Sequence, residues 1–278
     1  MDLWKQLSSL SEERVRGAAP RLAHIGGGHL GLRTAMVWKQ RLVLAPAREA
    51  TEGETVSMLF SGSRAKAHVR AWDQETGLTV LELEEGPEWN EPVIAPRAGT
   101  GALWLVTAYP SDQGVEASMG LVRFAGQTED PVFQTDTPDF PGFWGAVAWN
   151  ADGEWAAWQA SSRKGNSSWF LGADHITRLA SLLLEKGSRQ RVRLGVSIAA
   201  GEKDGRQGLL LTAVEPGSLA AGAGWKVGDW LFQLAGQEVH HPSDLWNRLG
   251  SRFRGEGIPW SGLIDGKESK GELVADWR

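Results

Sequence analysis

The chain has 278 residues, enough for two domains, and its composition of 41% hydrophobic and 23% charged residues is that of a globular protein. Its formal net charge of −5 at pH 7 argues against a nucleic-acid partner, because phosphate binding calls for a basic surface. The absence of cysteine excludes disulfides, thiolate metal sites and a cysteine nucleophile. No apolar run in the sequence is long enough to span a membrane.

Residues 1–20 are expected to form an N-terminal segment. Positions 3–16 favour a short helix, and Ser11 followed by Glu12 and Glu13 resembles an N-cap with acids in the first turn. The segment lacks the apolar central region of a signal peptide. We therefore expect either a cytoplasmic protein or a periplasmic or secreted one whose leader has been removed.

Residues 21–188 are predicted to form a first domain that is mostly β structure. Short alternating runs such as "TVSMLF", "LTVLELE" and "ALWLVTAYP" recur, each closed by glycine, proline or aspartate. This spacing is typical of antiparallel sandwiches or barrels. A helical pattern then follows in "ADHITRLASLLLEKGS", for which Asp174 is the expected N-cap and Gly187 the expected end.

Tryptophan is unusually abundant, with 15 residues in the chain. Five of them are concentrated in one region: Trp144, Trp149, Trp155, Trp158 and Trp169. Either they fill a core, since tryptophan buries a large area, or they form an exposed aromatic binding surface.

Residues 189–278 are predicted to form a second domain. In "EPGSLAAGAGWKVGDWLFQLAG", Ser218 is placed to cap a short helix at 219–222, and Gly228 and Asp229 turn the chain into a strand. A second helix is expected at about 243–250, capped by Ser243. This pattern of glycines and small residues resembles a PDZ domain of the bacterial type.

The PDZ resemblance implies a groove in which a partner's C-terminus adds as a strand while a loop of backbone N–H groups holds its carboxylate. The residues implied are the loop Arg193, Leu194, Gly195 and Val196, the groove strand Val196, Ser197 and Ile198, and the facing Leu245 and Leu249. The alternative is that Leu194 and Val196 are only part of a strand's core.

The stretch "FQTDTPDFPGFWGAVAWNADG", residues 133–153, resembles the nucleophile loop of the HtrA (Deg) serine proteases. The matching positions are Gln134, Thr135, Asp136, Pro141, Gly142, Gly145, Asn150, Asp152 and Gly153. Trp144 stands where that family has its catalytic serine. The resemblance covers nearly the whole chain and implies a chymotrypsin-like double β-barrel followed by a PDZ domain.

The other two catalytic positions of the family also differ in this chain. Arg48, in "VLAPAREA", stands at the histidine position, and Gly77, in "TGLTVLE", stands at the aspartate position. The reaction needs a nucleophile, a base and a group that orients the base. Tryptophan has no nucleophilic atom, and arginine stays protonated in proteins. We therefore expect a degenerate triad and no hydrolysis.

The sequence thus predicts an HtrA-like pseudoprotease that binds protein C-termini or unfolded segments as a scaffold, a chaperone-like binder or a regulator of an active relative in protein quality control. The resemblance also implies a homotrimer, with Leu3 and Trp4 as candidate contacts. No cofactor is expected, and no metal site, although His24 and His29 flank a glycine-rich run that could hold a metal. The alternative is an active serine endopeptidase with a non-standard site, for instance a dyad of His68 and Ser118.

Overall fold

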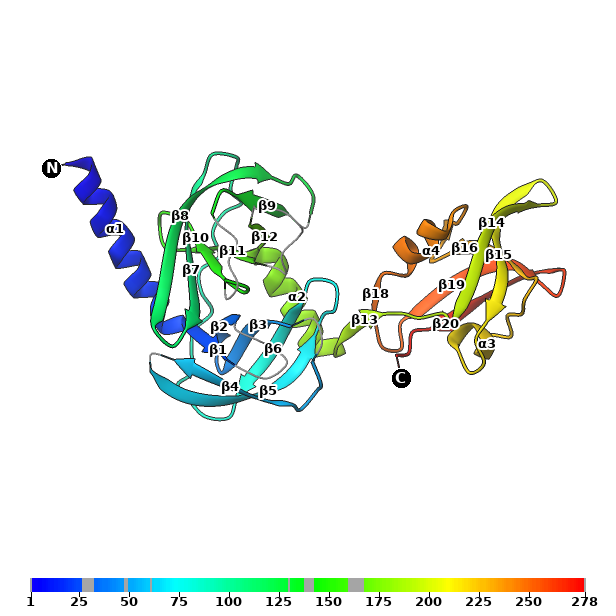
Figure 1. The fold of residues 1–278 in the computed structure, drawn as a ribbon, viewed down its shortest axis with the longest axis horizontal. Coiled ribbons are helices and arrows are strands. Elements are labelled where there is room, and N and C mark those ends of the chain that lie inside the picture. Colours follow the sequence, from blue (N-terminus) through cyan, green and yellow to red (C-terminus); the bar gives the residue numbers. More distant parts are fainter. Residues whose placement is uncertain are drawn as a thin grey trace. The chain divides into compact units, whose positions relative to one another are not determined.

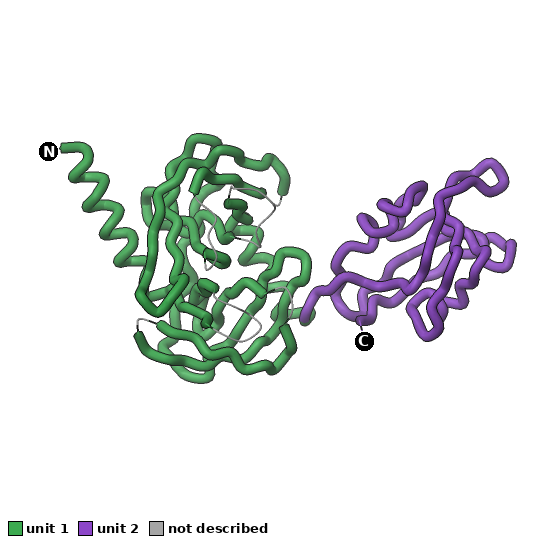
Figure 2. The backbone as a smooth tube through the Cα atoms, in the orientation of Figure 1, with its two compact units in different colours: residues 1–187 green, residues 188–278 purple. Residues whose placement is uncertain are grey.

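The computed structural model describes residues 2–26, 33–47, 50–60, 62–129, 131–137, 143–159 and 168–277. Figure 2 colours the two compact units into which the chain divides, residues 1–187 and residues 188–278. The limits of the domains inferred from the sequence stay a prediction, and the two units are described separately below.

The first half of unit 1 is a closed antiparallel barrel, shown in blue and cyan in Figure 1. Its strands are β1 (Leu22–Ile25), β2 (Arg33–Lys39), β3 (Leu42–Pro46), β4 (Thr55–Phe60), β5 (Ser63–Trp72) and β6 (Leu78–Leu83). They close in the order β1-β2-β3-β6-β5-β4. On β5, Ala67 and Val69 point into the core while Arg64, Lys66 and Arg70 are exposed, as the two-residue period of a strand dictates.

A second closed barrel follows, shown in green in Figure 1. Its strands are β7 (Leu103–Ser111), β8 (Gly114–Ala125), β9 (Val132–Thr135), β10 (Val147–Trp149), β11 (Trp155–Gln159) and β12 (Trp169–Gly172), in the order β10-β11-β12-β9-β8-β7. Two six-stranded barrels in the described part of the chain confirm the predicted chymotrypsin-like architecture.

Three of the five clustered tryptophans are buried within unit 1. Trp149, Trp155 and Trp158 are 5%, 0% and 0% exposed, whereas Trp144 and Trp169 are half-buried. Core filling is therefore the role of three of the five clustered tryptophans, in line with the large apolar area of the indole.

Two longer helices belong to unit 1, and both begin differently from the sequence-based expectation. The N-cap of α1 (Leu3–Ala18) is Asp2, whose carboxylate accepts a hydrogen bond from the Trp4 N–H at 3.2 Å; Ser11 lies mid-helix, so its assignment as a cap was wrong. A short 3-10 turn, η1 (Ala19–Arg21), leads into β1. The N-cap of α2 (Ala173–Lys186) is Gly172, which puts Asp174 in the first turn, and the helix ends at Gly187 as predicted.

Unit 2 is built on one sheet with the strand order β14-β15-β16-β19-β20. The strands are β14 (Val196–Lys203), β15 (Arg206–Val214), β16 (Trp230–Leu234), β19 (Gly257–Ile264) and β20 (Lys267–Val274), and β17 (Gln237–Glu238) pairs with β16. A separate pair is formed by β13 (Arg189–Arg191) and β18 (Ser251–Phe253). The helices are α3 (Leu219–Gly222) and α4 (Pro242–Leu249).

The two helices of unit 2 differ in how well their caps were predicted. Ser218 caps α3, accepting from the Ala221 N–H at 3.2 Å, as expected. The start of α4 is instead fixed by Asp244, which accepts from the N–H groups of His240 and His241 at 2.9 Å each, and the predicted cap Ser243 lies inside the helix. No helix in the described residues is both long and apolar enough to cross a membrane.

Candidate functional site

The turn that carries Trp144 lies between β9 and β10 and is fixed against the first barrel. The Trp144 carbonyl accepts from the Thr34 N–H at 2.9 Å. The Arg33 guanidinium stands over the indole, with 5.1 Å between its central carbon and the ring centroid, and its Nη1 donates to the Pro46 carbonyl at 2.7 Å. The position that the resemblance assigns to a nucleophile therefore holds a half-buried aromatic ring under an arginine.

Gly77 closes the turn between β5 and β6. Its N–H donates to the Asp73 carbonyl at 2.9 Å, and the Asp73 carboxylate accepts from the N–H and hydroxyl of Thr76 at 2.9 and 2.7 Å. Gly77 is buried, with a φ of 74°. This position has a well-formed turn but no side chain that could orient a base.

The end of β3 brings these two turns together. The Ala47 N–H donates to the Gly77 carbonyl at 2.7 Å, and the ring of Pro46 packs against Gly145. The chain then enters residues 48–49, so Arg48 lies outside the described residues. The turn of Gly77 and the turn that carries Trp144 thus both lie at the end of β3.

The residues around Trp144 that match the nucleophile loop keep an ordered arrangement. Asp136 ties β8 to the loop, since its carboxylate accepts from the Leu121 N–H at 2.7 Å. Asn150 closes the next hairpin by accepting from the N–H groups of Asp152 and Glu154 at 3.0 and 2.9 Å. Pro141 and Gly142 lie outside the described residues. Asp136 and Asn150 thus stabilise the described segments on either side of Trp144.

The suggested dyad of His68 and Ser118 is split between the two barrels. His68 is on β5, where its Nδ1 contacts the Thr55 hydroxyl at 3.2 Å and its Nε2 contacts Glu84 at 3.0 Å, whereas Ser118 is on β8. Both ring nitrogens of His68 thus have partners in the first barrel. Among the described residues no three His, Cys, Asp or Glu side chains gather as a metal site, and His29 lies outside them.

The loop assigned to carboxylate binding precedes β14 in unit 2. The carbonyls of Leu194 and Gly195 are engaged, accepting from Ala220 and Glu215 N–H groups at 3.1 and 2.8 Å. No described residue accepts a hydrogen bond from the N–H groups of Leu194 and Gly195. Gly195 has a φ of 69°, and a side chain there would collide with Ser218. The loop therefore presents backbone donors in a conformation suited to glycine.

The remaining residues assigned to the groove differ in exposure. Arg193 and Ser197 are exposed, and Val196 and Ile198 are partly buried. Leu245 and Leu249, on the helix that contacts β14, are 0% and 1% exposed and belong to the core against which Val196 and Ile198 pack. The two leucines thus support β14 from the core.

Known bacterial serine proteases resemble this chain in sequence. It is 24% identical over 242 residues to a probable periplasmic serine protease do/HhoA-like of Haemophilus influenzae, covering 78% of this chain and 52% of that protein. It is 27% identical over 252 residues to the serine protease Do-like HtrA of Bacillus subtilis, covering 78% and 56%. The chain is a homologue of the HtrA/DegP-type serine proteases.

This HtrA homologue spans about half the length of the curated relatives it matches, and no protein-family model matches it. Solved structures agree on the fold. The serine endoprotease from Yersinia pestis aligns with a TM-score of 0.68 at 20% identity over 95% of this chain and 96% of that one. The HtrA-type protease AlgW with a decapeptide aligns with a TM-score of 0.62 at 20% identity over 96% and 97%.

The sequence analysis did not identify Arg33, whose guanidinium lies over the Trp144 indole. An arginine at the first position of an apolar strand is ordinarily taken as a solvated end, so no local pattern distinguishes it. It also missed Asp244, whose pKa is held below its usual value by the hydrogen bonds from the His240 and His241 N–H groups. Both residues act through backbone partners whose positions only the fold reveals.

Proposed function

We propose that this HtrA homologue is a pseudoprotease that captures polypeptides. The observation that carries the loss of hydrolysis is the pairing of Trp144 with Arg33 beside Gly77, since the half-buried indole is fixed where a nucleophile would stand. A serine nucleophile, a histidine base and an orienting carboxylate act as one unit in this chemistry. None of these groups occupies position 48, 77 or 144 in the sequence.

Unit 2 is proposed to be the binding module, a PDZ domain covering residues 189–278. β14 is an edge strand whose only described partner is β15, so its other edge can accept an added strand. The N–H groups of Leu194 and Gly195, which precede that strand, are the proposed donors to a terminal carboxylate, and Arg193 adds a positive charge. A related solved structure, AlgW, contains a decapeptide.

The binding proposal is tested with fluorescent peptides of varied C-terminal sequence on the full chain. We expect saturable binding of peptides with a free C-terminal carboxylate and at least tenfold weaker binding of the same peptides with an amidated C-terminus. Arg193→Gln should weaken binding several-fold, whereas Lys203→Gln, at the far end of β14, should not. Binding that ignores both amidation and Arg193 would contradict carboxylate capture.

The loss of hydrolysis is tested with a serine-directed phosphonate probe and with casein. We expect neither labelling nor cleavage. Labelling at any residue would favour the alternative function, an active endopeptidase with a non-standard site, and mapping of the labelled residue would locate it.

Assembly and location follow the same proposal. Leu3 and Trp4 on α1 are 65% and 76% exposed, which suits contacts in a homotrimer. A periplasmic location is proposed because a matched relative is named as a periplasmic protease. As a scaffold or a regulator, this protein would then act in the same compartment as an active relative and the unfolded polypeptides that the relative cleaves.

A further inference from the structure

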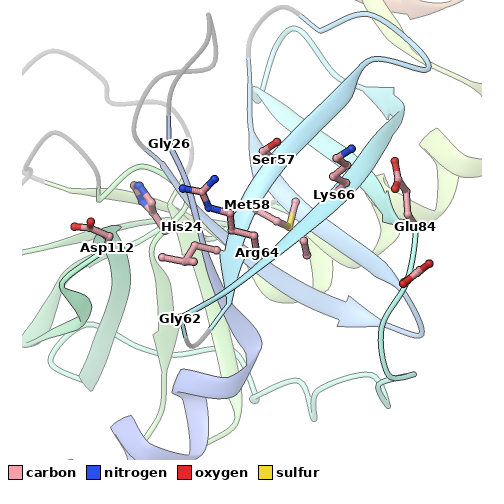
Figure 3. Close-up of a pocket in the computed structure, with 12 residues that line it drawn as sticks. His24, Gly26, Ser57, Met58, Gly62, Arg64, Lys66, Glu84 and Asp112 are labelled. Carbon is pink, nitrogen blue, oxygen red and sulfur yellow. The ribbon is translucent and has the colours of Figure 1, made fainter.

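A pocket of about 850 Å³ opens on unit 1, between the first barrel and the turn that joins β7 and β8 (Figure 3). Its volume lies in the range of small-molecule sites. Its lining combines the apolar side chains of Met58, Leu59 and Ala65 with polar and charged side chains. Arg33, Gly77 and Trp144 do not line it, and neither does any residue of unit 2. It is therefore a separate feature from both parts of the proposed function.

His24 supplies a fixed hydrogen-bonding group to this pocket. The side chain is on β1, only 8% exposed, and its Nδ1 lies 3.1 Å from the Tyr109 carbonyl oxygen. A carbonyl can only accept, so Nδ1 carries the proton and Nε2 of the neutral ring is an acceptor. Nε2 lies against Gly26 at the rim of the pocket and has no partner among the described residues. A nearly buried imidazole is thus held in one tautomer with its acceptor unused.

Arg64 and Lys66 supply two positive charges on the same face of β5. Neither forms an ion pair or side-chain hydrogen bond with a described residue, whereas Arg70, further along the strand, pairs with Glu82. Ser57 is directly opposite Lys66 in the register of β4 and β5, so its hydroxyl projects from the same face. In Figure 3 the Arg64 guanidinium is drawn between His24 and Ser57. Two cations and a hydroxyl in this arrangement suit a carboxylate or phosphate oxyanion.

The acidic residues of the rim limit what the ligand can be. Glu84 is engaged by His68 at 3.0 Å, and the Asp112 carboxylate accepts from the Gln113 amide at 3.3 Å. Together with Glu85 these carboxylates would repel a polyanion. Figure 3 shows Glu84 beside Lys66, whereas His24 and Asp112 lie on the opposite side of the pocket. His24 Nε2 and the Asp112 carboxylate would accept hydrogen bonds from hydroxyl or ammonium groups. The lining therefore fits a ligand that has one anionic group at one end and hydrogen-bond donors at the other.

We propose that this pocket binds a small molecule carrying a single carboxylate or phosphate group together with hydroxyl or ammonium donors. Arg64, Lys66 and Ser57 hold the oxyanion, while His24 and Asp112 accept from the donors. The site lies on unit 1 apart from positions 77 and 144, and it would give this unit a ligand-binding role of its own.

The test is NMR titration of the isotopically labelled full chain with inorganic phosphate and, separately, with acetate, at constant ionic strength. We expect saturable shifts in β4, β5 and His24 with at least one probe, and the two arms distinguish phosphate from carboxylate recognition. The double variant Arg64→Gln, Lys66→Gln should weaken binding at least tenfold. Arg70→Gln is the matched control on the same strand and face, and it should change the affinity less than twofold.

Ser57→Ala is a second, smaller change at an exposed position, and it should weaken binding several-fold while leaving the spectrum outside the pocket unchanged. Shifts that rise linearly without saturation with both probes would overturn the proposal. Equal affinities in the double variant, in Arg70→Gln and in the unchanged chain would overturn it as well.

Discussion

Arg33 and Trp144 form a stacked pair between the two barrels, with the guanidinium 5.1 Å from the indole centroid and anchored to the Pro46 carbonyl at 2.7 Å. The arginine belongs to β2 of the first barrel, and the tryptophan belongs to the turn before β10 of the second. Because this hydrogen bond anchors the guanidinium, the indole packs against a fixed cation. The pair therefore links the proposed loss of chemistry at position 144 to the stability of unit 1.

Replacement of Trp144 by serine should lower the stability of unit 1 without creating hydrolysis. The variant loses half-buried aromatic area and a cation–π contact worth about 0.5–2 kcal/mol, so we expect a total loss of about 1–3 kcal/mol in the free energy of unfolding. Urea unfolding and a casein assay would measure the two effects.

Trp246→Ser is the matched control for this substitution, since Trp246 is 56% exposed on α4. Its effect on the free energy of unfolding should stay within about 0.5 kcal/mol. Equal stability of the Trp144 and Trp246 variants would contradict the stacking role, and casein cleavage by Trp144→Ser would contradict the proposed degeneracy.

Gly145→Ala should destabilise unit 1 more than an ordinary glycine replacement in a left-handed turn. Gly145 has a φ of 85°, and a Cβ there would collide with the Thr34 carbonyl oxygen and the Pro46 ring. Gly53→Ala is a suitable reference, because Gly53 has a φ of 79° with open space around the added atom. The reference should cost about 1–2 kcal/mol from backbone strain alone.

We expect Gly145→Ala to exceed that cost by about 2 kcal/mol, since a backbone oxygen cannot move as a side-chain end can. Chemical denaturation of both variants under the same conditions would measure the difference. Equal losses would mean that the contact between the turn and β2 is looser than the structure indicates.

Local patterns were sufficient to predict antiparallel β structure in unit 1, as a sandwich or as barrels, and the resemblance to the HtrA proteases selected the double barrel. Alternation on β5 and the turn glycines repeat along the chain, and each strand pairs mainly with a near neighbour. The end of α2 at Gly187 and the cap of α3 by Ser218 were predicted for the same reason, since a glycine or a serine acts on its own helix.

The site was harder to predict because its contacts join distant segments. Arg33 meets Trp144 across more than a hundred residues, and His24 is fixed by Tyr109 from the other barrel. Asp2 rather than Ser11 caps α1, since several polar residues near the N-terminus satisfied the same pattern. The spacing of the PDZ family assigned Leu245 to the peptide groove, but only the packing of unit 2 reveals that its side chain is buried.

The stability of unit 2 should depend on pH through Asp244. Hydrogen bonds from the backbone N–H groups of His240 and His241, the first having the larger effect, hold the pKa of this carboxyl below its usual value in the folded state. A depressed pKa contributes stability above the pKa of the unfolded chain, and this contribution is lost as the pH falls through the folded pKa. Asp244→Asn should therefore be less stable than the unchanged chain at neutral pH, and the difference should vanish in acid.

Thermal unfolding followed from neutral pH to below the usual pKa of aspartate would measure this difference. Asp204→Asn, in the turn between β14 and β15, is the control, because no described residue donates a hydrogen bond to its carboxylate. A gap between the unchanged chain and Asp244→Asn that stays constant over the whole range would contradict the role of the charged carboxylate.

Leu245 and Trp246 are neighbours on α4, and their replacement by alanine should lower the free energy of unfolding by very different amounts. Leu245 is 0% exposed and lies in the core of unit 2, whereas Trp246 is 56% exposed. Leu245→Ala should cost about 2–5 kcal/mol because it removes buried methyl groups and leaves a cavity. Trp246→Ala should stay within about 0.5 kcal/mol.

Hydrogen exchange followed by mass spectrometry of peptides from residues 188–277 would assign these changes to unit 2. If Leu245→Ala also loses peptide binding, its faster exchange would identify the loss as unfolding, so Leu245 would be a supporting residue of the proposed groove. Unchanged exchange together with lost binding would instead place Leu245 in direct contact with the peptide, which its complete burial argues against.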